Sequence, residues 1–122
     1  MIYEKELSQK VIGCALNVYH ALGSGFLEKI YEKSLMIEFQ RQNIHVKCQV
    51  PIKVHYLNIV VGDYFADLVV DNKIILELKH VSALCLTHEA QLINYLKATG
   101  IKVGYLINFG KPNGLEFKRL VY

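Results

Sequence analysis

Two acidic residues and a lysine lie in an otherwise apolar part of the sequence, where full charges are unusual. Asp67 belongs to FADLVV, and Glu77 and Lys79 belong to IILELKH. Two carboxylates close together repel each other unless a cation lies between them, and carboxylate oxygens suit Mg²⁺ or Mn²⁺. A divalent cation that activates water, beside a lysine that stabilises charge, is the equipment of phosphodiester hydrolysis. A structural ion-pair cluster is the alternative, although burying charge is costly.

The carboxylates can meet only if the connection between their two segments has a suitable length. Both segments have the composition of buried strands, in which alternate side chains point to opposite faces. A two-residue turn at positions 71–72 would place Asp67 and Glu77 on different faces, whereas an odd-numbered turn would bring them together. Asn72 tolerates the left-handed conformation that a three-residue turn requires. We therefore predict an odd-numbered turn or an equivalent bulge.

The hydrophobic pattern predicts the elements that position these residues. Apolar residues at three- and four-residue spacing indicate amphipathic helices at about 4–22 and 26–42. The period then changes to two, which indicates strands. The expected strands are 46–56, 59–70, 73–80, 103–108 and 115–122. Pro51 indicates that the first of these is an edge strand, and Gly62 indicates a break in the second. The third helix is expected between Thr87 as N-cap and Gly100 as C-terminal stop. The order α-α-β-β-β-α-β-β predicts one mixed α/β domain over residues 1–122.

The composition is that of an ordinary globular domain. The 122 residues are 52% hydrophobic and 20% charged, and the net charge of +3 permits a polyanionic partner without requiring one. No apolar run approaches the roughly 20 residues that a membrane-spanning helix needs, so we expect no membrane partner. The polar start MIYEKELSQK contains no signal-peptide core. The three cysteines are far apart, so we expect reduced thiols in a cytoplasmic protein rather than a zinc site.

Three segments together resemble a known protein family. Asp67 followed after nine residues by ELK (77–79) resembles the PD-(D/E)XK nuclease signature of the restriction-endonuclease-like fold. The segment GFLEKIY (25–31) matches the GxxExxY motif of a small bacterial family of predicted nucleases in this superfamily. HEAQLINYLKATG (88–100) and VGYLINFG (103–110) closely resemble the C-terminal half of that family. The resemblance implies a restriction-endonuclease-like core, with a mixed β-sheet flanked by helices.

The resemblance also implies roles for the charged strand. Asp67 and Glu77 would bind Mg²⁺ or Mn²⁺, with the backbone carbonyl of Leu78 as a third ligand. Lys79 would position or activate the attacking water and stabilise the pentavalent phosphate. Ala66 replaces the proline of the signature, which leaves the metal ligand itself intact.

Two residues of the GxxExxY motif are further candidates. Many restriction-like nucleases supply an acidic residue from an early helix to the metal site, and Glu28 is in a position to do so. Alternatively, Glu28 forms a capping-box-like arrangement with Gly25 as N-cap. Tyr31 either packs and forms hydrogen bonds or contacts substrate.

The third predicted helix carries a polar face. His88, Gln91 and Tyr95 follow one another at three- and four-residue spacing, so they share that face. The Q-x-x-x-Y spacing resembles the motif of RecB-like nucleases, which implies that Gln91 completes the active site and that Tyr95 and His88 contact substrate. The alternatives are a satisfied polar face and, for His88, a cap on its own helix.

These features predict a metal-dependent nuclease, with nucleic acid of unknown type as the partner. The alternative is a non-catalytic module that retains the fold and binds nucleic acid or protein. Hydrolysis of another phosphoester is a third reading. The sequence contains no evident recognition domain, which favours the binding module or a nuclease aimed by a targeting partner. A domain that cuts both strands would need to form a homodimer. Scattered lysines can contact phosphates, although such residues usually form a solvated surface.

Overall fold

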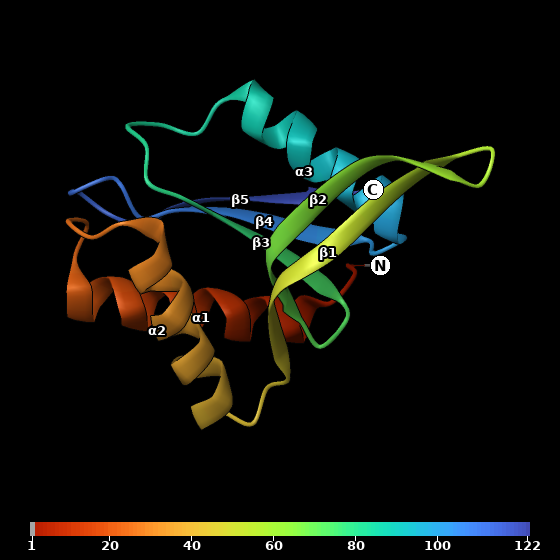
Figure 1. The fold of residues 1–122 in the computed structure, drawn as a ribbon. Helices are drawn as coiled ribbons and strands as arrows, with labels where there is room; N and C mark the ends of the chain where they lie inside the picture. The colour runs from red at the N-terminus through yellow and green to blue at the C-terminus, as the bar shows by residue number, and fades with distance from the viewer. Residues whose placement is uncertain (1) are drawn as a thin grey trace.

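A mixed five-stranded sheet with helices on both faces organises residues 2–122, which are the part of the chain that the computed structural model describes (Figure 1). The elements in chain order are α1 (Lys5–Leu22), α2 (Glu28–Arg41), β1 (Val46–Tyr56), β2 (Ile59–Val70), β3 (Ile74–Lys79), α3 (Leu86–Thr99), β4 (Val103–Asn108) and β5 (Glu116–Val121). This order confirms the α/β fold class and the α-α-β-β-β-α-β-β succession expected from the sequence.

The strands lie side by side in chain order, β1-β2-β3-β4-β5. All neighbours are antiparallel except β3 and β4, which are parallel because α3 carries the chain back across the sheet. Helices α1 and α2 cover one face and α3 covers the other (Figure 1). Strand β1 lies at the edge, as Pro51 predicts. None of the helices that the structure describes is long and apolar enough to cross a membrane.

The centre of the sheet is buried on both faces. Every residue of β4 is buried, and so is every residue of β3 except Lys79. Helix α3 packs so closely on β4 that a Cβ at Gly104 would lie 2.9 Å from a side-chain carbon of Leu92. Glu77, in β3, therefore lies in the most buried strand pair of the fold.

The turn between β2 and β3 has the odd length that the sequence predicts. Val70 pairs with Ile74, so residues 71–73 form a three-residue connection. The backbone N–H of Lys73 donates to the Val70 carbonyl at 2.9 Å. Asp71 and Asn72 both have positive φ, 52° and 54°, which aspartate and asparagine tolerate better than most residues. This turn sets the register of the whole β2–β3 hairpin.

Two helices begin at residues other than those expected. Helix α3 begins at Leu86 with Cys85 as N-cap, rather than with Thr87. The reason is His88, whose Nδ1 accepts the backbone N–H of Cys85 at 3.2 Å and so satisfies that group. Helix α2 begins at Glu28 with Leu27 as N-cap, two residues after the expected start.

The β1–β2 hairpin extends beyond the rest of the sheet (yellow and green in Figure 1). Of the residues of β1, only Ile52 is buried, because no helix covers the outer part of the hairpin. The β1–β2 pairing shifts between Val54 and His55, opposite the predicted break near Gly62. Apolar side chains are therefore exposed over much of the hairpin: Val54, Tyr56, Leu57, Ile59, Val60, Val61, Tyr64 and Phe65.

Candidate active site

Asp67 and Glu77 meet where strands β2 and β3 separate. Backbone pairing of the two strands runs from Val70 to Leu68 and stops there. At the next position, the backbone N–H of Asp67 donates to Oε2 of Glu77 at 2.8 Å. The backbone N–H of Leu78 donates to Oδ2 of Asp67, also at 2.8 Å. The carboxylates thus satisfy buried backbone donors in place of the sheet ladder, and these bonds fix both side chains.

Burial makes the charged forms of Asp67 and Glu77 unfavourable. Glu77 is only 5% exposed, and burial, followed by the negative charge of Asp67, raises its pKa to about 8. Burial also raises the pKa of Asp67, against the lowering effect of the hydrogen bond from Leu78. Near neutral pH the Glu77 carboxyl is therefore largely protonated unless a cation compensates its charge.

Lys79 lies two residues after Glu77 at the end of β3 and is half-buried. Its backbone carbonyl accepts the N–H of Phe109 at 2.8 Å, which anchors the strand end to the segment after β4. The charge of Lys79 lowers the pKa of both Asp67 and Glu77. No ion pair of residues 2–122 includes Lys79, so its ammonium is not consumed by a structural salt bridge.

A groove of about 380 Å³ opens beside Asp67 on the side of α2. Glu28, the first residue of α2, lines this groove together with Asp67 and Leu78. The negative charge of Glu28 also contributes to the raised pKa of Glu77. Because Leu27 rather than Gly25 is the N-cap, the capping-box alternative for Glu28 is not formed. The structure thus brings Glu28 to the carboxylate pair.

Glu32 and Gln49 also line this groove and were not among the residues predicted from the sequence. Gln49 Nε2 donates to Oε1 of Glu32 at 2.6 Å and lies 3.4 Å from Oδ1 of Asp67. Glu32 is 6% exposed and pairs with Lys29 at 3.0 Å. One helical turn separates Glu32 from Glu28, a spacing that could have indicated it. Gln49 gave no such signal, because its position depends on a left-handed backbone (φ 50°) within β1.

Tyr95 and Gln91 lie on the α3 side of the sheet. Tyr95 is 5% exposed, and burial, followed by the charges of Glu77 and Asp67, raises its pKa to about 12. Gln91 is exposed and lines a second groove, between α3 and the β1–β2 hairpin, to which Tyr95 also contributes. The structure therefore brings Tyr95 near the carboxylates and places Gln91 in a different groove from Glu28.

His88 and Tyr31 are engaged in structural contacts. His88 caps α3 through Cys85, as described above. Tyr31 is fully buried, its ring stacks on Phe109 at a centroid distance of 4.2 Å, and its hydroxyl donates to the Gly23 carbonyl at 2.6 Å. These placements correspond to the capping and packing alternatives. Tyr31 holds the segment before α2 and thereby the start of the helix that carries Glu28.

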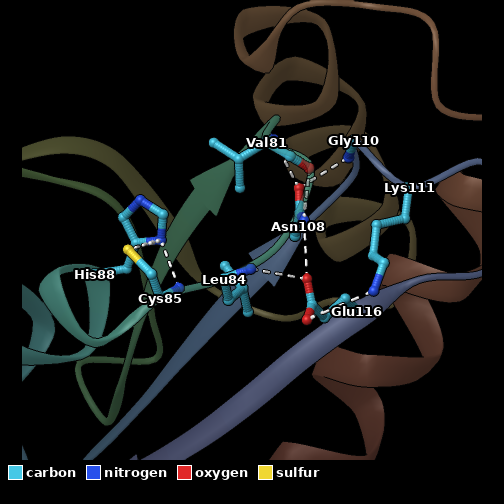
Figure 2. A network of polar contacts seen from close by, with 8 residues as sticks. All are labelled: Val81, Leu84, Cys85, His88, Asn108, Gly110, Lys111 and Glu116. Atoms are coloured by element: carbon cyan, nitrogen blue, oxygen red, sulfur yellow. Dashed lines mark hydrogen bonds and ion pairs between the residues drawn. The ribbon is translucent and has the colours of Figure 1, made fainter.

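A polar network fixes the segment that follows Lys79, as Figure 2 shows. Asn108 is fully buried; its Oδ1 accepts the N–H groups of Val81 and Gly110 at 3.0 and 2.9 Å. Its Nδ2 donates to the Val81 carbonyl and to Oε1 of Glu116, both at 2.9 Å. The same Glu116 oxygen accepts the N–H of Leu84 at 3.1 Å. The end of β3 is thus tied to β4 and β5.

The donor atoms at the strand separation fit a small divalent cation. Mg²⁺ and Mn²⁺ prefer oxygen ligands, and Mg²⁺ usually takes one or two carboxylates and keeps several waters. Asp67 and Glu77 supply two carboxylates, and Oε1 of Glu77 takes part in none of the hydrogen bonds of the described residues. Residues 2–122 contain no group of three or more His, Cys, Asp or Glu side chains arranged to hold a metal ion.

Comparison with known proteins identifies the family to which this chain belongs. The sequence profile of the PD-(D/E)XK nuclease superfamily matches residues 5–120, so the chain belongs to that superfamily, whose members typically use divalent metals. No curated protein matches the chain. The crystal structure of SSO0001 is similar in fold, with a TM-score of 0.60 and 21% identity over 97% of this chain. The match covers 59% of that longer chain, and at this identity it shows the fold alone.

Proposed function

We propose that this protein is a nuclease that hydrolyses phosphodiester bonds with Mg²⁺ or Mn²⁺. The observation that carries the proposal is the opposed pair Asp67 and Glu77, held by backbone donors at the separation of β2 and β3. Lys79, which forms no ion pair with the described residues, lies on the same strand and adds the cationic group that this chemistry requires. Membership in the PD-(D/E)XK nuclease superfamily supports the same reaction class.

The side chains would divide the work as follows. Asp67 and Glu77 would hold the cation with the backbone carbonyl of Leu78, and the bound cation would supply Lewis-acid activation of phosphate and water. Lys79 would stabilise the negative charge that develops on the phosphate, because no carboxylate of the described chain pairs with it. The backbone N–H groups of Asp67 and Leu78 keep both carboxylates oriented before substrate arrives.

Two neighbouring residues would complete the site. Glu28 would contribute a third negative charge from the start of α2, next to Asp67. On the strength of the motif GFLEKIY, we also propose that the chain belongs to the GxxExxY group within the superfamily. Gln91 would contact the nucleic acid from the groove on the α3 side, which Tyr95 also lines.

A cleavage assay tests this proposal. Single- and double-stranded DNA and RNA are incubated with Mg²⁺ or Mn²⁺ and with wild type, Glu77→Gln or Lys79→Ala. We expect wild type to cleave at least one substrate and each variant to be slower by at least about 100-fold, as is typical for removal of a charge-stabilising group. Asp71→Asn and Lys73→Ala are matched controls, because these residues form an exposed ion pair in the turn between the same two strands.

The outcome separates the candidate functions. Cleavage that persists in Glu77→Gln and Lys79→Ala would refute the assigned site. If wild type binds nucleic acid or a protein but cleaves nothing, the protein is a non-catalytic binding module that retains the nuclease fold. Cleavage lost equally in the two control variants would indicate a general loss of structure.

A further inference from the structure

The groove between α3 and the β1–β2 hairpin is separate from the groove beside Asp67, and Tyr95 lines it. Its volume is about 820 Å³, within the range of about 300–1,000 Å³ that is usual for ligand sites. The residues that matter for its chemistry are Lys53, His55 and Tyr64 from the hairpin and Gln91, Tyr95 and Lys97 from α3. We call it the hairpin groove.

The hairpin groove contains an exposed aromatic ring, that of Tyr64, which packs against the buried Tyr95. Tyr64 is 46% exposed, and its ring centroid lies 5.7 Å from that of Tyr95, with the rings tilted by 45°. Tyr95 is almost completely buried, so its ring is a fixed surface on which one side of Tyr64 packs. Tyr95 packs in the same buried cluster as Ala66, the residue before Asp67, so the groove lies near the candidate active site.

The walls of the hairpin groove are positively charged. Lys53 and Lys97 stand on opposite walls, and none of the described residues that line the groove is acidic. Lys53 has an exposed partner outside the groove, Asp63, at 3.3 Å, and such an exposed ion pair is weak enough for a phosphate to replace it. Gln91 and Asn94 add side-chain amides, which both donate and accept hydrogen bonds.

We propose that the hairpin groove binds an unpaired nucleotide of a single-stranded nucleic acid, with a base stacked on Tyr64 and phosphates near Lys53 and Lys97. Stacking on a protein ring needs a free base face, which a continuous duplex keeps inside its own stack. The groove would thus select single strands or unpaired ends for the proposed nuclease. The inference rests on that proposed function for its biological meaning, but binding can be measured without cleavage.

Binding of fluorescent oligonucleotides by anisotropy tests the inference. Single-stranded DNA, single-stranded RNA and the matching duplexes are titrated with protein in the presence of EDTA, so that no metal-dependent cleavage occurs. We expect Tyr64→Ala to weaken single-strand binding by about 5- to 150-fold, the usual effect of losing one base–aromatic stack. Tyr64→Phe keeps the ring and should bind like wild type.

Tyr56→Ala is the matched control, because Tyr56 is 68% exposed on the same hairpin but does not line the groove. It should leave binding unchanged. Lys97→Ala should reduce the salt dependence of single-strand binding. A stronger response to DNA or to RNA would identify which of the two single strands the groove prefers.

Three results would overturn the inference: unchanged binding by Tyr64→Ala, equal loss in Tyr56→Ala, or wild-type binding that is absent or favours the duplex. Its failure is distinguishable from failure of the proposed function. Tyr64-dependent binding without any cleavage would contradict only the nuclease, whereas cleavage with Tyr64-independent binding would contradict only the groove.

Discussion

The buried charge of Glu77 lowers the stability of the folded protein when no cation is bound. A carboxyl with a raised pKa binds its proton more tightly in the folded than in the unfolded protein. Its contribution to stability is therefore fully present below the unfolded value of 4.5 and is lost as the pH rises towards about 8. Removing the ionisable group should remove this pH dependence.

We predict that Glu77→Gln flattens the pH profile of stability. In EDTA, the free energy of unfolding of wild type should fall relative to the variant between about pH 5 and pH 8, by at most about 1.4 kcal/mol per pH unit. Glutamine keeps an oxygen that can accept the Asp67 N–H, so the hydrogen bond to the backbone is retained. Urea unfolding at several pH values measures the difference, and parallel profiles for wild type and variant would contradict it. Asp71→Asn, in the exposed turn, should follow wild type.

Some residues of the candidate site could be predicted from the sequence and others could not. The full charges of Asp67, Glu77 and Lys79 stand out against apolar neighbours, so residue type alone indicated them. Gln49 reaches the site only through an unusual backbone conformation in an edge strand. A glutamine between alternating apolar residues is otherwise typical of a solvent-facing position, and no local pattern distinguishes the two cases.

At the scale of elements, the segment between β3 and α3 depends on one buried amide. Asn108 holds Val81 and Gly110 and is itself bonded to Glu116. A Cβ at Gly110 would lie 2.5 Å from the Val81 carbonyl oxygen, so the two segments are in close backbone contact. A side chain at position 110 would therefore collide with the backbone of Val81 and disrupt the network around Asn108.

We predict that Asn108→Ala lowers the free energy of unfolding by about 2 kcal/mol or more. The substitution leaves the partly buried N–H groups of Val81 and Gly110 without their acceptor, and each unsatisfied group costs about 1–3 kcal/mol. Chemical denaturation measures the change. Asn113→Ala, in the exposed turn before β5, is the control and should alter stability by less than about 0.5 kcal/mol. Similar effects of the two substitutions would contradict this account of the loop.

Element types were easier to predict than element ends. Helical spacing and strand alternation identified all three helices and all five strands. The predicted start of α3 at Thr87 was wrong, because the Cys85–His88 contact, visible in Figure 2, outweighs the usual preference for threonine as N-cap. Gly100, by contrast, ends α3 as predicted, because its φ of 77° favours glycine.

At the scale of the whole molecule, the outer β1–β2 hairpin is peripheral to the cores. The alternation of β1 predicts a half-buried strand, but no other element covers its outer part, and the alternation itself carries no information about that. Tyr56 pairs with Ile59, so Leu57 and Asn58 form a two-residue turn, and both have positive φ. Leucine is unfavourable there, whereas asparagine is common in such turns.

We predict different effects of two substitutions in this hairpin. Ile52→Ala should destabilise the protein by about 2–5 kcal/mol, because Ile52 packs in the core beneath α3. Leu57→Asn should leave stability unchanged or raise it by up to about 1 kcal/mol, because it relieves an unfavourable turn residue that makes no core contact. Thermal unfolding measures both. Destabilisation by Leu57→Asn comparable to that of Ile52→Ala would show that the outer hairpin belongs to the core.

The central claim is that Asp67 and Glu77 together hold a divalent cation. Calorimetric titration with MnCl₂ tests it without substrate, and repeating the titration in buffers of different ionisation enthalpy counts the protons released. We predict binding by wild type with proton release at pH 7, because Glu77 must lose its proton, and less release at pH 9. Asp67→Asn and Glu77→Gln should abolish this binding, and Asp71→Asn should retain it. Equal Mn²⁺ binding by wild type and by both site variants, or no binding by wild type, would contradict the account.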